Sequence, residues 1–379
     1  MSKNLLPKNL SALKVALVHD DLVVQYGGAE KVFMAVAEMF PDAPVYTSMA
    51  TREWGKRLEG RELITSFMQR LPLKEKLFKF YFLLYPLAFE SFNLSDYDLV
   101  ISSSTRFAHG VITKPETKHV CYTHSPGRMF WEPERYFGPN SRLKTLLAPA
   151  LSYLRLWDRA AAQRVDHFIA NSKNIAGKIR KYYGREASVV HPFVDLERFK
   201  PLVGSQEPGD YYLVVTRLAP WKRVEIVIEA AKEANVPLKV VGGGSDRKRL
   251  EDLATRNSPH ATNQIEILGR VSDGEVDDLF QNCKALIMTQ EEDFGITALE
   301  AQTCGKPVIA YRSGGALETV EEGKTGEFFH PQSADALAKV LKDFKTGDYK
   351  PEVCRANAER FSKKEFKRKL FNELGKIGG

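Results

Sequence analysis

Short apolar runs alternate with helical patterns along the whole 379-residue chain. The first half contains the runs KVALVHD (14–20), DLVISSS (98–104), HVCYTHS (119–125) and HFIANS (167–172). The second half contains YYLVVTR (211–217), LKVVGG (238–243), QIEILGR (264–270), KALIMTQ (284–290) and PVIAYRSGG (307–315). Continuous apolar strands separated by helices are typical of parallel sheets that are covered on both faces. The pattern predicts an α/β protein with two doubly wound, Rossmann-like domains.

A segment rich in Pro, Gly and polar residues, FKPLVGSQEPGDYY (199–212), separates the two series of strands. Such a composition is typical of interdomain linkers. We therefore expect a first domain over 1–200 and a second over 201–360. Ligands of doubly wound sheets bind at the carboxyl ends of the strands, so we expect the strand-end loops of both domains to face a cleft.

Composition narrows the class of protein. Hydrophobic residues make up 43% of the chain and charged residues 27%, as in ordinary globular proteins. The four cysteines have no paired spacing, which argues against a disulfide framework or a zinc site and favours a reducing, cytosolic setting. We see neither a signal-peptide pattern nor a run of about 20 apolar residues, and expect no transmembrane helix. Residues 1–200 carry 29 Lys and Arg against 20 Asp and Glu, so this half is the one expected to meet an anionic surface or substrate.

The strand end TRLAPWKR (216–223) places two cations where a helix is expected to begin. Pro220 can open that helix, because the first turn does not use the N–H that proline lacks. Arg217 and Lys222 then lie near a helix N-terminus, which favours anions over cations. A bound diphosphate would satisfy both cations and the free N–H groups. A solvated pair of surface cations remains the alternative.

Three further strand ends carry glycine turns. Gly27 and Gly28 follow the first strand, Gly242 and Gly243 follow the second strand of the second half, and Arg270 ends the third, where it could frame a nucleobase. Glycine allows close approach of a backbone to a ligand such as a phosphate. An ordinary turn between strand and helix explains each of them equally well.

Two other strand boundaries carry polar side chains. His124 ends the strand 119–125 and precedes a Pro-Gly turn, which makes it a candidate for hydrogen bonding a sugar or phosphate, although a lone histidine is more often structural. Asp96 and Asp98 have the D-x-D spacing but precede a strand, so we interpret them as the turn that starts it and expect no metal there. No H-E-x-x-H, G-x-S-x-G or Walker A pattern is present.

The segment EEDFGITALE (291–300) brackets a turn, Phe294–Ile296, with two glutamates. We expect a helix to begin at Thr297, where Thr297 and Glu300 match a capping box. Such a cap would stabilise the helix by about 0.5–2 kcal/mol. Capping explains neither Glu292 nor the turn. If the helix N-terminus meets a ligand, its N–H groups can bind a phosphate while the glutamates accept hydrogen bonds from sugar and ribose hydroxyls.

Together these segments resemble the retaining glycosyltransferases of family four, which have the GT-B fold. The resemblance covers nearly the whole chain and rests on GGAEKV, ANS (170–172), VVHPFVDLERF (189–199), RLAPWK, VVGGGSD, LGRVSD, EEDFGITALE and GGALETV. Within the family, YTHSPGRMFWE is similar to bacterial mannosyltransferases of lipopolysaccharide O-antigen and exopolysaccharide assembly. The resemblance also implies that the last segment, 361–379, forms a helix that returns to the first domain.

The resemblance implies roles for the candidate residues. Arg217 and Lys222 would bind the donor diphosphate and stabilise the departing nucleotide in place of a metal. Glu292 would contact the transferred sugar and His124 would lie at the reacting centre, which completes the implied catalytic set. The implied donor-binding residues are Gly27, Gly28, Arg217, Lys222, Gly242, Gly243, Arg270, Val271, Glu292, Phe294, Gly295, Ile296, Thr297 and Glu300. Neither a metal nor a cofactor is expected.

The implied reaction moves a hexose, mannose from GDP-mannose, to a lipid-linked saccharide. Retention would follow from attack by the acceptor hydroxyl on the front face of the donor, with the leaving phosphate as base. The alternatives are a UDP-sugar-dependent transferase, a GT-B epimerase or phosphorylase, and a non-catalytic nucleotide-sugar binding protein. A phosphorylase would need a lysine-held pyridoxal cofactor, for which no motif is present, and an inactive relative should have lost Arg217, Lys222 or Glu292. We expect no nucleic-acid partner.

The segment 67–92, FMQRLPLKEKLFKFYFLLYPLAFESF, interleaves Lys74, Lys76 and Lys79 with aromatic residues. A basic, aromatic segment suits the interface of an anionic bilayer, where a polyprenyl-linked acceptor would reside. We therefore expect a cytoplasmic enzyme that associates peripherally with the inner face of the plasma membrane. The alternative is a helix packed on its own domain with solvated lysines.

Overall fold

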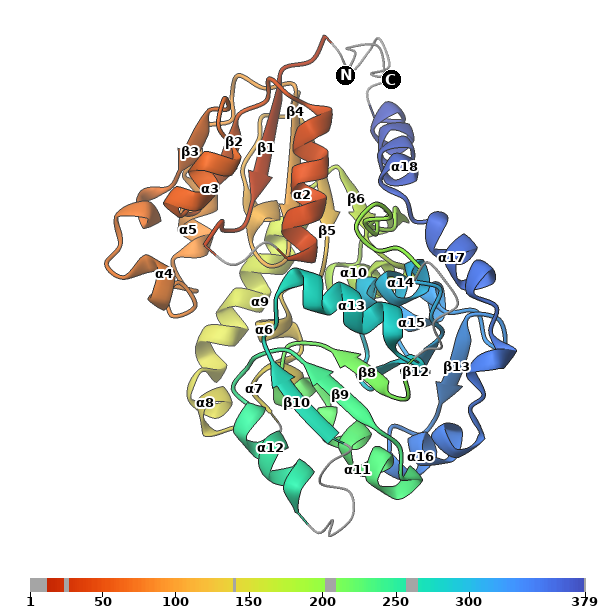
Figure 1. The fold of residues 1–379 in the computed structure, drawn as a ribbon. Coiled ribbons are helices and arrows are strands. Elements are labelled where there is room, and N and C mark those ends of the chain that lie inside the picture. Colours follow the sequence, from red (N-terminus) through yellow and green to blue (C-terminus); the bar gives the residue numbers. More distant parts are fainter. Residues whose placement is uncertain (1–11, 24–26, 139–140, 202–208, 257–264, 378–379) are drawn as a thin grey trace. The chain divides into compact units, whose positions relative to one another are not determined.

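The computed structural model describes residues 12–23, 27–138, 141–201, 209–256 and 265–377, and it divides into two compact units. The first unit comprises Met1–Pro192 and Lys364–Gly379, and the second comprises Phe193–Lys363. Each unit contains one parallel sheet with helices (Figure 1). The predicted pair of Rossmann-like α/β domains is therefore confirmed.

The chain passes between the units at Pro192–Phe193, and not at 200/201 as expected. Val194 and Phe199 are buried in the core of the second unit, and the Val194 N–H donates to the Phe361 carbonyl oxygen at 3.0 Å. These contacts tie residues before the Pro- and Gly-rich segment to the second unit, and residues 202–208 of that segment lie outside the described residues. The chain returns to the first unit at Lys364, three residues after the expected position.

The first unit is built on a seven-stranded parallel sheet with the order β3-β2-β1-β4-β5-β6-β7. Its strands are β1 (Val15–His19), β2 (Val45–Thr47), β3 (Leu63–Thr65), β4 (Leu99–Ser104), β5 (Lys118–Thr123), β6 (His167–Ala170) and β7 (Ala187–Val189). The strand order reverses direction between β1 and β4, so the loops that follow these two strands diverge at the carboxyl edge.

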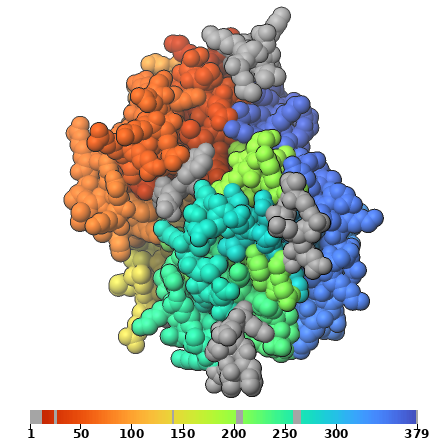
Figure 2. Space-filling view, viewed as in Figure 1, coloured from red at the N-terminus to blue at the C-terminus, as the bar shows by residue number. Residues whose placement is uncertain are grey.

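Helices surround this sheet on both faces (Figure 1). They are α2 (Gly28–Met39), α3 (Arg52–Arg57), η2 (Phe67–Arg70), α4 (Lys74–Leu77), α5 (Tyr85–Glu90), η3 (Ala108–Gly110), α6 (Arg128–Trp131), α7 (Pro133–Phe137), α8 (Arg142–Leu146), α9 (Ala148–Ala162) and α10 (Lys173–Tyr183). The terminal helix α18 (Lys363–Gly375) packs beside α2, where the Lys367 ammonium lies 2.8 Å from the Glu38 carboxylate. Figure 2 shows the blue atoms of α18 against the orange-red atoms of the first unit.

The second unit has a six-stranded parallel sheet with the order β10-β9-β8-β11-β12-β13. Its strands are β8 (Tyr212–Val215), β9 (Leu238–Val241), β10 (Ile265–Gly269), β11 (Leu286–Met288), β12 (Val308–Tyr311) and β13 (Gly326–Phe329). Its helices are η4 (Pro220–Lys222), α11 (Val224–Ala234), α12 (Arg247–Thr255), α13 (Asp273–Asn282), α14 (Ile296–Thr303), α15 (Ala316–Thr319), α16 (Ala334–Asp343), η5 (Thr346–Asp348) and α17 (Pro351–Glu359).

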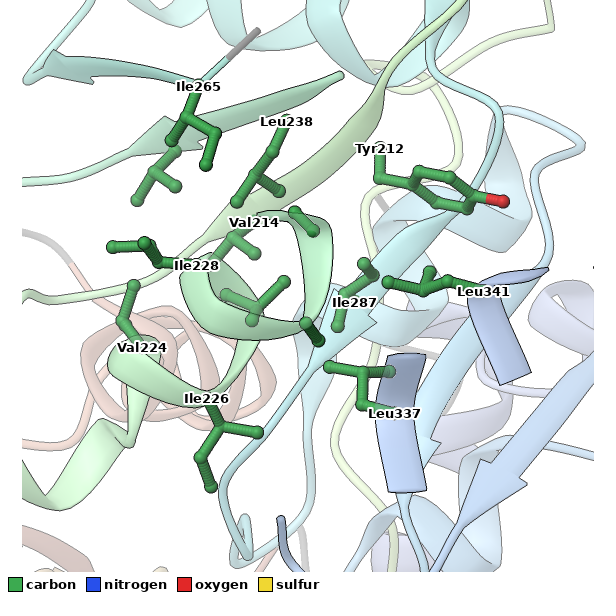
Figure 3. Close-up of a cluster of buried hydrophobic side chains, with 14 of the residues drawn as sticks. Tyr212, Val214, Val224, Ile226, Ile228, Leu238, Ile265, Ile287, Leu337 and Leu341 are labelled. Atoms are coloured by element: carbon green, nitrogen blue, oxygen red, sulfur yellow. The ribbon is translucent and has the colours of Figure 1, made fainter. Parts of the chain in front are cut away.

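The core of the second unit shows why the apolar runs form strands. Val214 and Ile287 of neighbouring strands face Ile228 of α11 and Leu337 and Leu341 of α16 (Figure 3). A second buried cluster lies on the opposite face and includes residues of β8, β11 and α14. Because both faces are covered, the strands are apolar at consecutive positions, without alternation.

Two further observations bear on the expectations from composition. All four cysteines are free and buried. Within the described ranges, no helix has both the length and the apolar character needed to cross a membrane.

Gly326 provides a test of how closely β13 packs on β12. A Cβ at this position would lie 1.9 Å from the Val308 carbonyl oxygen, so Gly326→Ala must push the two strands apart. We expect a loss of about 1–3 kcal/mol in the free energy of unfolding, measured by urea denaturation. The matched control is Gly274→Ala in α13, where a Cβ meets no atom within 4 Å. Equal stability of the two variants would contradict this packing.

Candidate functional site

The carboxyl edge of the second sheet brings together two of the predicted site residues. Lys222 lies in the loop after β8, Glu292 lies in the loop after β11, and these two strands are neighbours in the sheet. The Lys222 ammonium forms an ion pair with Oε1 of Glu292. Only 10% of the Lys222 side chain and 18% of the Glu292 side chain is exposed, so the pair is largely removed from water.

Gln290 is part of the same cluster, although the sequence reading did not single it out. Its side-chain nitrogen donates to Oε1 of Glu292 at 2.5 Å, and the residue is 4% exposed. The neighbouring Thr289 hydroxyl donates to the Lys222 carbonyl oxygen at 3.0 Å. Gln290 and Glu292 are two residues apart in the loop after β11, and this spacing was the available signal.

The loop that carries Lys222 differs from the predicted helix start. Pro220 opens a single 3₁₀ turn, η4, that ends at Lys222. Arg223 then adopts a left-handed backbone conformation with φ of 55°, and α11 begins only at Val224. The left-handed residue separates the turn from the helix, so Lys222 does not lie in the first turn of α11.

Arg217 is placed differently from Lys222. Its side chain is exposed after β8, and across the described residues no hydrogen bond or ion pair joins it to Lys222 or Glu292. The structure therefore brings one of the two predicted cations to the glutamate and leaves the other toward solvent.

The glycines after β9 contact the chain itself. A Cβ on Gly242 would lie 1.7 Å from the Thr216 carbonyl oxygen, and one on Gly244 would lie 1.9 Å from that of Leu218. The Leu218 N–H also donates to the Gly243 carbonyl oxygen at 3.0 Å. The loops after β8 and β9 thus pack backbone to backbone, which accounts for glycine at 242 without any ligand.

Gly243 and Arg270 are brought together at this edge. A Cβ on Gly243 would lie 2.9 Å from Nε of Arg270, whose side chain is exposed. Val271 is half-buried and packs against the second buried cluster of this unit. The Arg270 side chain thus lies over Gly243.

The turn before α14 is where the capping prediction is wrong. The helix begins at Ile296, one residue early, because Gly295 takes the N-cap position in a left-handed conformation with φ of 90°. Thr297 is then inside the first turn, and no side chain caps this helix. Capping therefore does not explain the half-buried Glu300.

Neighbouring chain fixes the backbone around Glu292. The Gly315 N–H donates to the Glu292 carbonyl oxygen at 2.8 Å, and Glu292 and Gly314 form an isolated parallel bridge. The Phe294 side chain is buried against Phe361, with ring centroids 5.7 Å apart. The side chain of Phe294 is therefore not available to a ligand.

In the first unit, His124 belongs to a buried polar chain. Its Nε2 lies 2.9 Å from the Ser103 hydroxyl, which lies 3.2 Å from Nδ1 of His19. The adjacent Ser102 bonds His119 at 2.8 Å, and burial lowers the pKa of His119 to about 3. Three consecutive serines, Ser102–Ser104, each bind a histidine, a pattern that the sequence reading missed although SSS stands at a strand end.

The predicted phosphate-binding glycines, Gly27 and Gly28, start α2. The Gly27 N–H donates to the carboxylate of Glu30 at 3.0 Å. Burial raises the pKa of Glu30, and the nearby His19 opposes that shift. A phosphate at Gly27 would therefore compete with a carboxylate of the same helix.

A second buried carboxylate, Asp20, organises the loop after β4. It accepts hydrogen bonds from the backbone N–H groups of residues 105–108, with distances between 2.5 and 3.0 Å. Burial opposes its ionisation, but Arg106, His19 and these hydrogen bonds outweigh burial and lower the pKa of Asp20. Arg106 also pairs with Asp21. The sequence signal for this site was HDD at the end of the first strand.

Metal ligands are not grouped in the described parts of the chain, where no cluster of three or more His, Cys, Asp or Glu could hold an ion. Asp98 lies in the turn before β4, as predicted, and its carboxylate accepts from the Lys14 N–H at 2.8 Å.

Comparisons with known proteins relate both parts of the chain to glycosyltransferases. The model named Glycosyltransferase Family 4 matches residues 26–198, and the model named Glycosyl transferases group 1 matches residues 196–361. An uncharacterized glycosyltransferase of Methanocaldococcus jannaschii is 28% identical over 211 residues, which are 55% of this chain and 58% of the relative. The D-inositol 3-phosphate glycosyltransferase of Streptomyces coelicolor is 28% identical over 218 residues, 47% of each chain. The chain thus spans about half the length of the curated relatives it matches.

Solved structures agree on the fold. The Anabaena protein HepE in complex with UDP has a TM-score of 0.69 at 20% identity, over 95% of this chain and 100% of that chain. The sucrose-phosphate synthase of Thermosynechococcus elongatus has a TM-score of 0.63 at 17% identity, over 96% and 98%. The first part of the chain, residues 26–198, and the second part, residues 196–361, are thus each similar to a glycosyltransferase family, and the solved structures share the two-domain fold.

Proposed function

We propose that this protein is a retaining glycosyltransferase that moves a hexose from a nucleotide sugar to an acceptor hydroxyl. The observation that carries the proposal is the buried Lys222–Glu292 ion pair at the carboxyl edge of the second sheet. It lies in the part of the chain that matches glycosyl transferases group 1.

The ion pair offers a cation for the diphosphate of a nucleotide sugar and a carboxylate for the hydroxyl groups of its sugar. A donor brings an anion for Lys222 and hydroxyl groups for Glu292, so each side chain exchanges its present partner for a ligand group. As the bond between the sugar and the phosphate breaks, negative charge grows on the phosphate, and a cation fixed in a site poor in water stabilises that charge. The acceptor oxygen bonds to the anomeric carbon on the same face, and its proton passes to the leaving phosphate. The exposed Arg217 would have to turn toward the phosphates to share this role.

We propose GDP-mannose as the donor, and the support is the similarity of YTHSPGRMFWE to bacterial mannosyltransferases. A UDP-sugar is the alternative, because HepE was crystallised with UDP and with UDP-glucose. A GT-B epimerase would share the same pocket chemistry but would form no glycoside. In the first unit, His124 and the Gly27–Gly28 turn are proposed to contact the sugar and the phosphates, and no metal is invoked.

We further propose a lipid-linked saccharide as acceptor and peripheral association with the inner face of the plasma membrane. The structure changes which residues of 67–92 support this proposal, because part of the segment is buried. Phe78 is buried, and Tyr81 and Phe82 pack partly against the core of the first unit. The exposed residues that support membrane contact are instead Phe80, 73% exposed, with Lys76 and Lys79.

Replacing Glu292 tests the reaction. We expect Glu292→Gln to reduce sugar transfer by roughly 100-fold or more, the effect typical of removing one electrostatic group from an active site. Transfer is measured as glycoside formed from a panel of sugar nucleotides with membrane acceptor. Glu233→Gln, which removes an exposed partner of Lys342 in the same unit, is the control. Full activity of Glu292→Gln would show that this site does not perform the reaction.

The nucleobase is testable by ligand stabilisation. We expect GDP to raise the melting temperature more than UDP or ADP, since a ligand at 100 times its Kd stabilises the folded state by about 2.7 kcal/mol. A larger shift with UDP would replace GDP-mannose by a UDP-sugar and leave the transferase proposal standing. Nucleotide release without acceptor, and without any glycoside, would exclude transfer.

The basic residues of 67–92 test membrane contact. We expect the variant Lys74→Glu, Lys76→Glu, Lys79→Glu to lose most binding to anionic liposomes, because each lysine near such a surface contributes about 1 kcal/mol. The control replaces Lys339, Lys345 and Lys350, which are exposed in the second unit, with glutamate and makes the same change in net charge. If both variants bind like the wild type, this segment does not contact lipid.

A further inference from the structure

The first unit carries nearly all of the exposed apolar side chains. Eleven of the twelve large hydrophobic side chains that are exposed within the described residues lie in this unit, and the twelfth is Leu317. Four of the eleven lie on α8 and α9. They are Leu143 (50% exposed), Leu146 (77%), Tyr153 (54%) and Leu156 (73%). Such a concentration of exposed apolar residues indicates an interaction surface.

The apolar residues of α9 form one stripe. The side chains at positions 149, 153, 156 and 160 are spaced three and four residues apart, so they share one side of α9, and all are exposed. Leu143 and Leu146 are exposed on the preceding helix, α8. The other side of α9 packs into the unit through the buried Leu151, Leu154 and Ala161. One apolar face of α9 therefore packs into the core of the first unit, and a second apolar face is exposed to solvent.

The exposed charged residues of α8 and α9 are cations, although Lys144 of α8 pairs with the exposed Glu134 of α7. Asp158 is the sole carboxylate between residues 135 and 165 of the sequence, and it is fully buried, where it accepts from the Trp131 indole at 2.6 Å. Arg142 and Arg159, in contrast, are exposed. Two copies of this face would bring like charges together. An anionic bilayer instead offers an apolar interior for the side chains and the opposite charge for the cations.

We propose that the exposed apolar side chains of α8 and α9, Leu143, Leu146, Tyr153 and Leu156, insert into the headgroup region of an anionic bilayer. This contact is separate from 67–92 but lies on the same unit, because the Trp157 indole donates to the Glu90 carboxylate at the end of α5 at 2.8 Å. One turn earlier on α5, Leu87 is 61% exposed. Figure 2 shows the orange atoms of residues around 70–85 and the yellow atoms of α8 and α9 toward the left of the view. The proposal does not depend on the chemistry proposed above.

The test uses the full chain and sedimented vesicles of phosphatidylcholine with or without phosphatidylglycerol. We expect the wild type to bind the vesicles that contain phosphatidylglycerol and the variant Leu146→Glu, Leu156→Glu to bind them at least tenfold more weakly. The matched control is Leu317→Glu, which makes the same change at an exposed site of the second unit. Wild-type binding by the double variant, or an equal loss in the control, would overturn the proposal.

A second measurement does not depend on how well the charged variant folds. Because the four native cysteines are buried, an environment-sensitive dye can be placed on Leu146→Cys alone. We expect its emission to shift to the blue when vesicles with phosphatidylglycerol are added, and the emission of a dye on Leu317→Cys to stay unchanged. No shift at 146, or a shift that follows protein concentration instead of lipid and so indicates a second copy, would reject the bilayer as the partner.

Discussion

Close packing of backbone on backbone is the constraint on which the second unit's site depends. The loops after β8 and β9 meet where Gly242 lies against the Thr216 carbonyl group, and the loop after β11 is bonded through Glu292 to Gly315 of the loop after β12. Backbone hydrogen bonds of this kind cannot be lengthened without leaving buried polar groups unpaired. The loops therefore hold one another at the carboxyl edge.

At that edge, the Lys222–Glu292 ion pair combines a cost in desolvation with a gain in electrostatic attraction. Removing two charges from water is costly, and their mutual attraction compensates only when the remaining hydrogen-bonding positions are also filled. Gln290 supplies one such bond to the carboxylate, and Trp221 covers the ammonium, with its ring centroid 4.2 Å from Nζ. A diphosphate and a sugar hydroxyl would offer each charge a partner of its own, so binding need not create a buried charge. This is the physical basis for proposing that these two residues bind the donor.

The sequence predicted the strands that are buried on both faces, because they leave a continuous apolar run. It did not predict short strands, the start of α14 or side-chain partners, because these depend on local geometry. Three of the strands it missed, β2, β3 and β7, are only three residues long, and β13 begins with glycine and a glutamate. The capping box at Thr297 was wrong because a left-handed glycine can start a helix without any side-chain cap. Asp20 was missed because its partners, the N–H groups of residues 105–108, are distant in sequence.

The two lipid-facing proposals show why exposure has to be seen in three dimensions. In 67–92, basic and aromatic residues alternate conspicuously, yet Phe78 is in the core and Phe80 alone of its aromatic neighbours is strongly exposed. In α9, apolar residues surround the helix, a pattern that by itself indicates a buried helix. Only the packing separates Leu154, which faces the core, from Leu156, which does not. From composition alone, 67–92 would be expected to expose more aromatic residues than it does, and the exposed apolar face of α9 is not visible. Composition shows which residues are apolar but not which of them pack in the core.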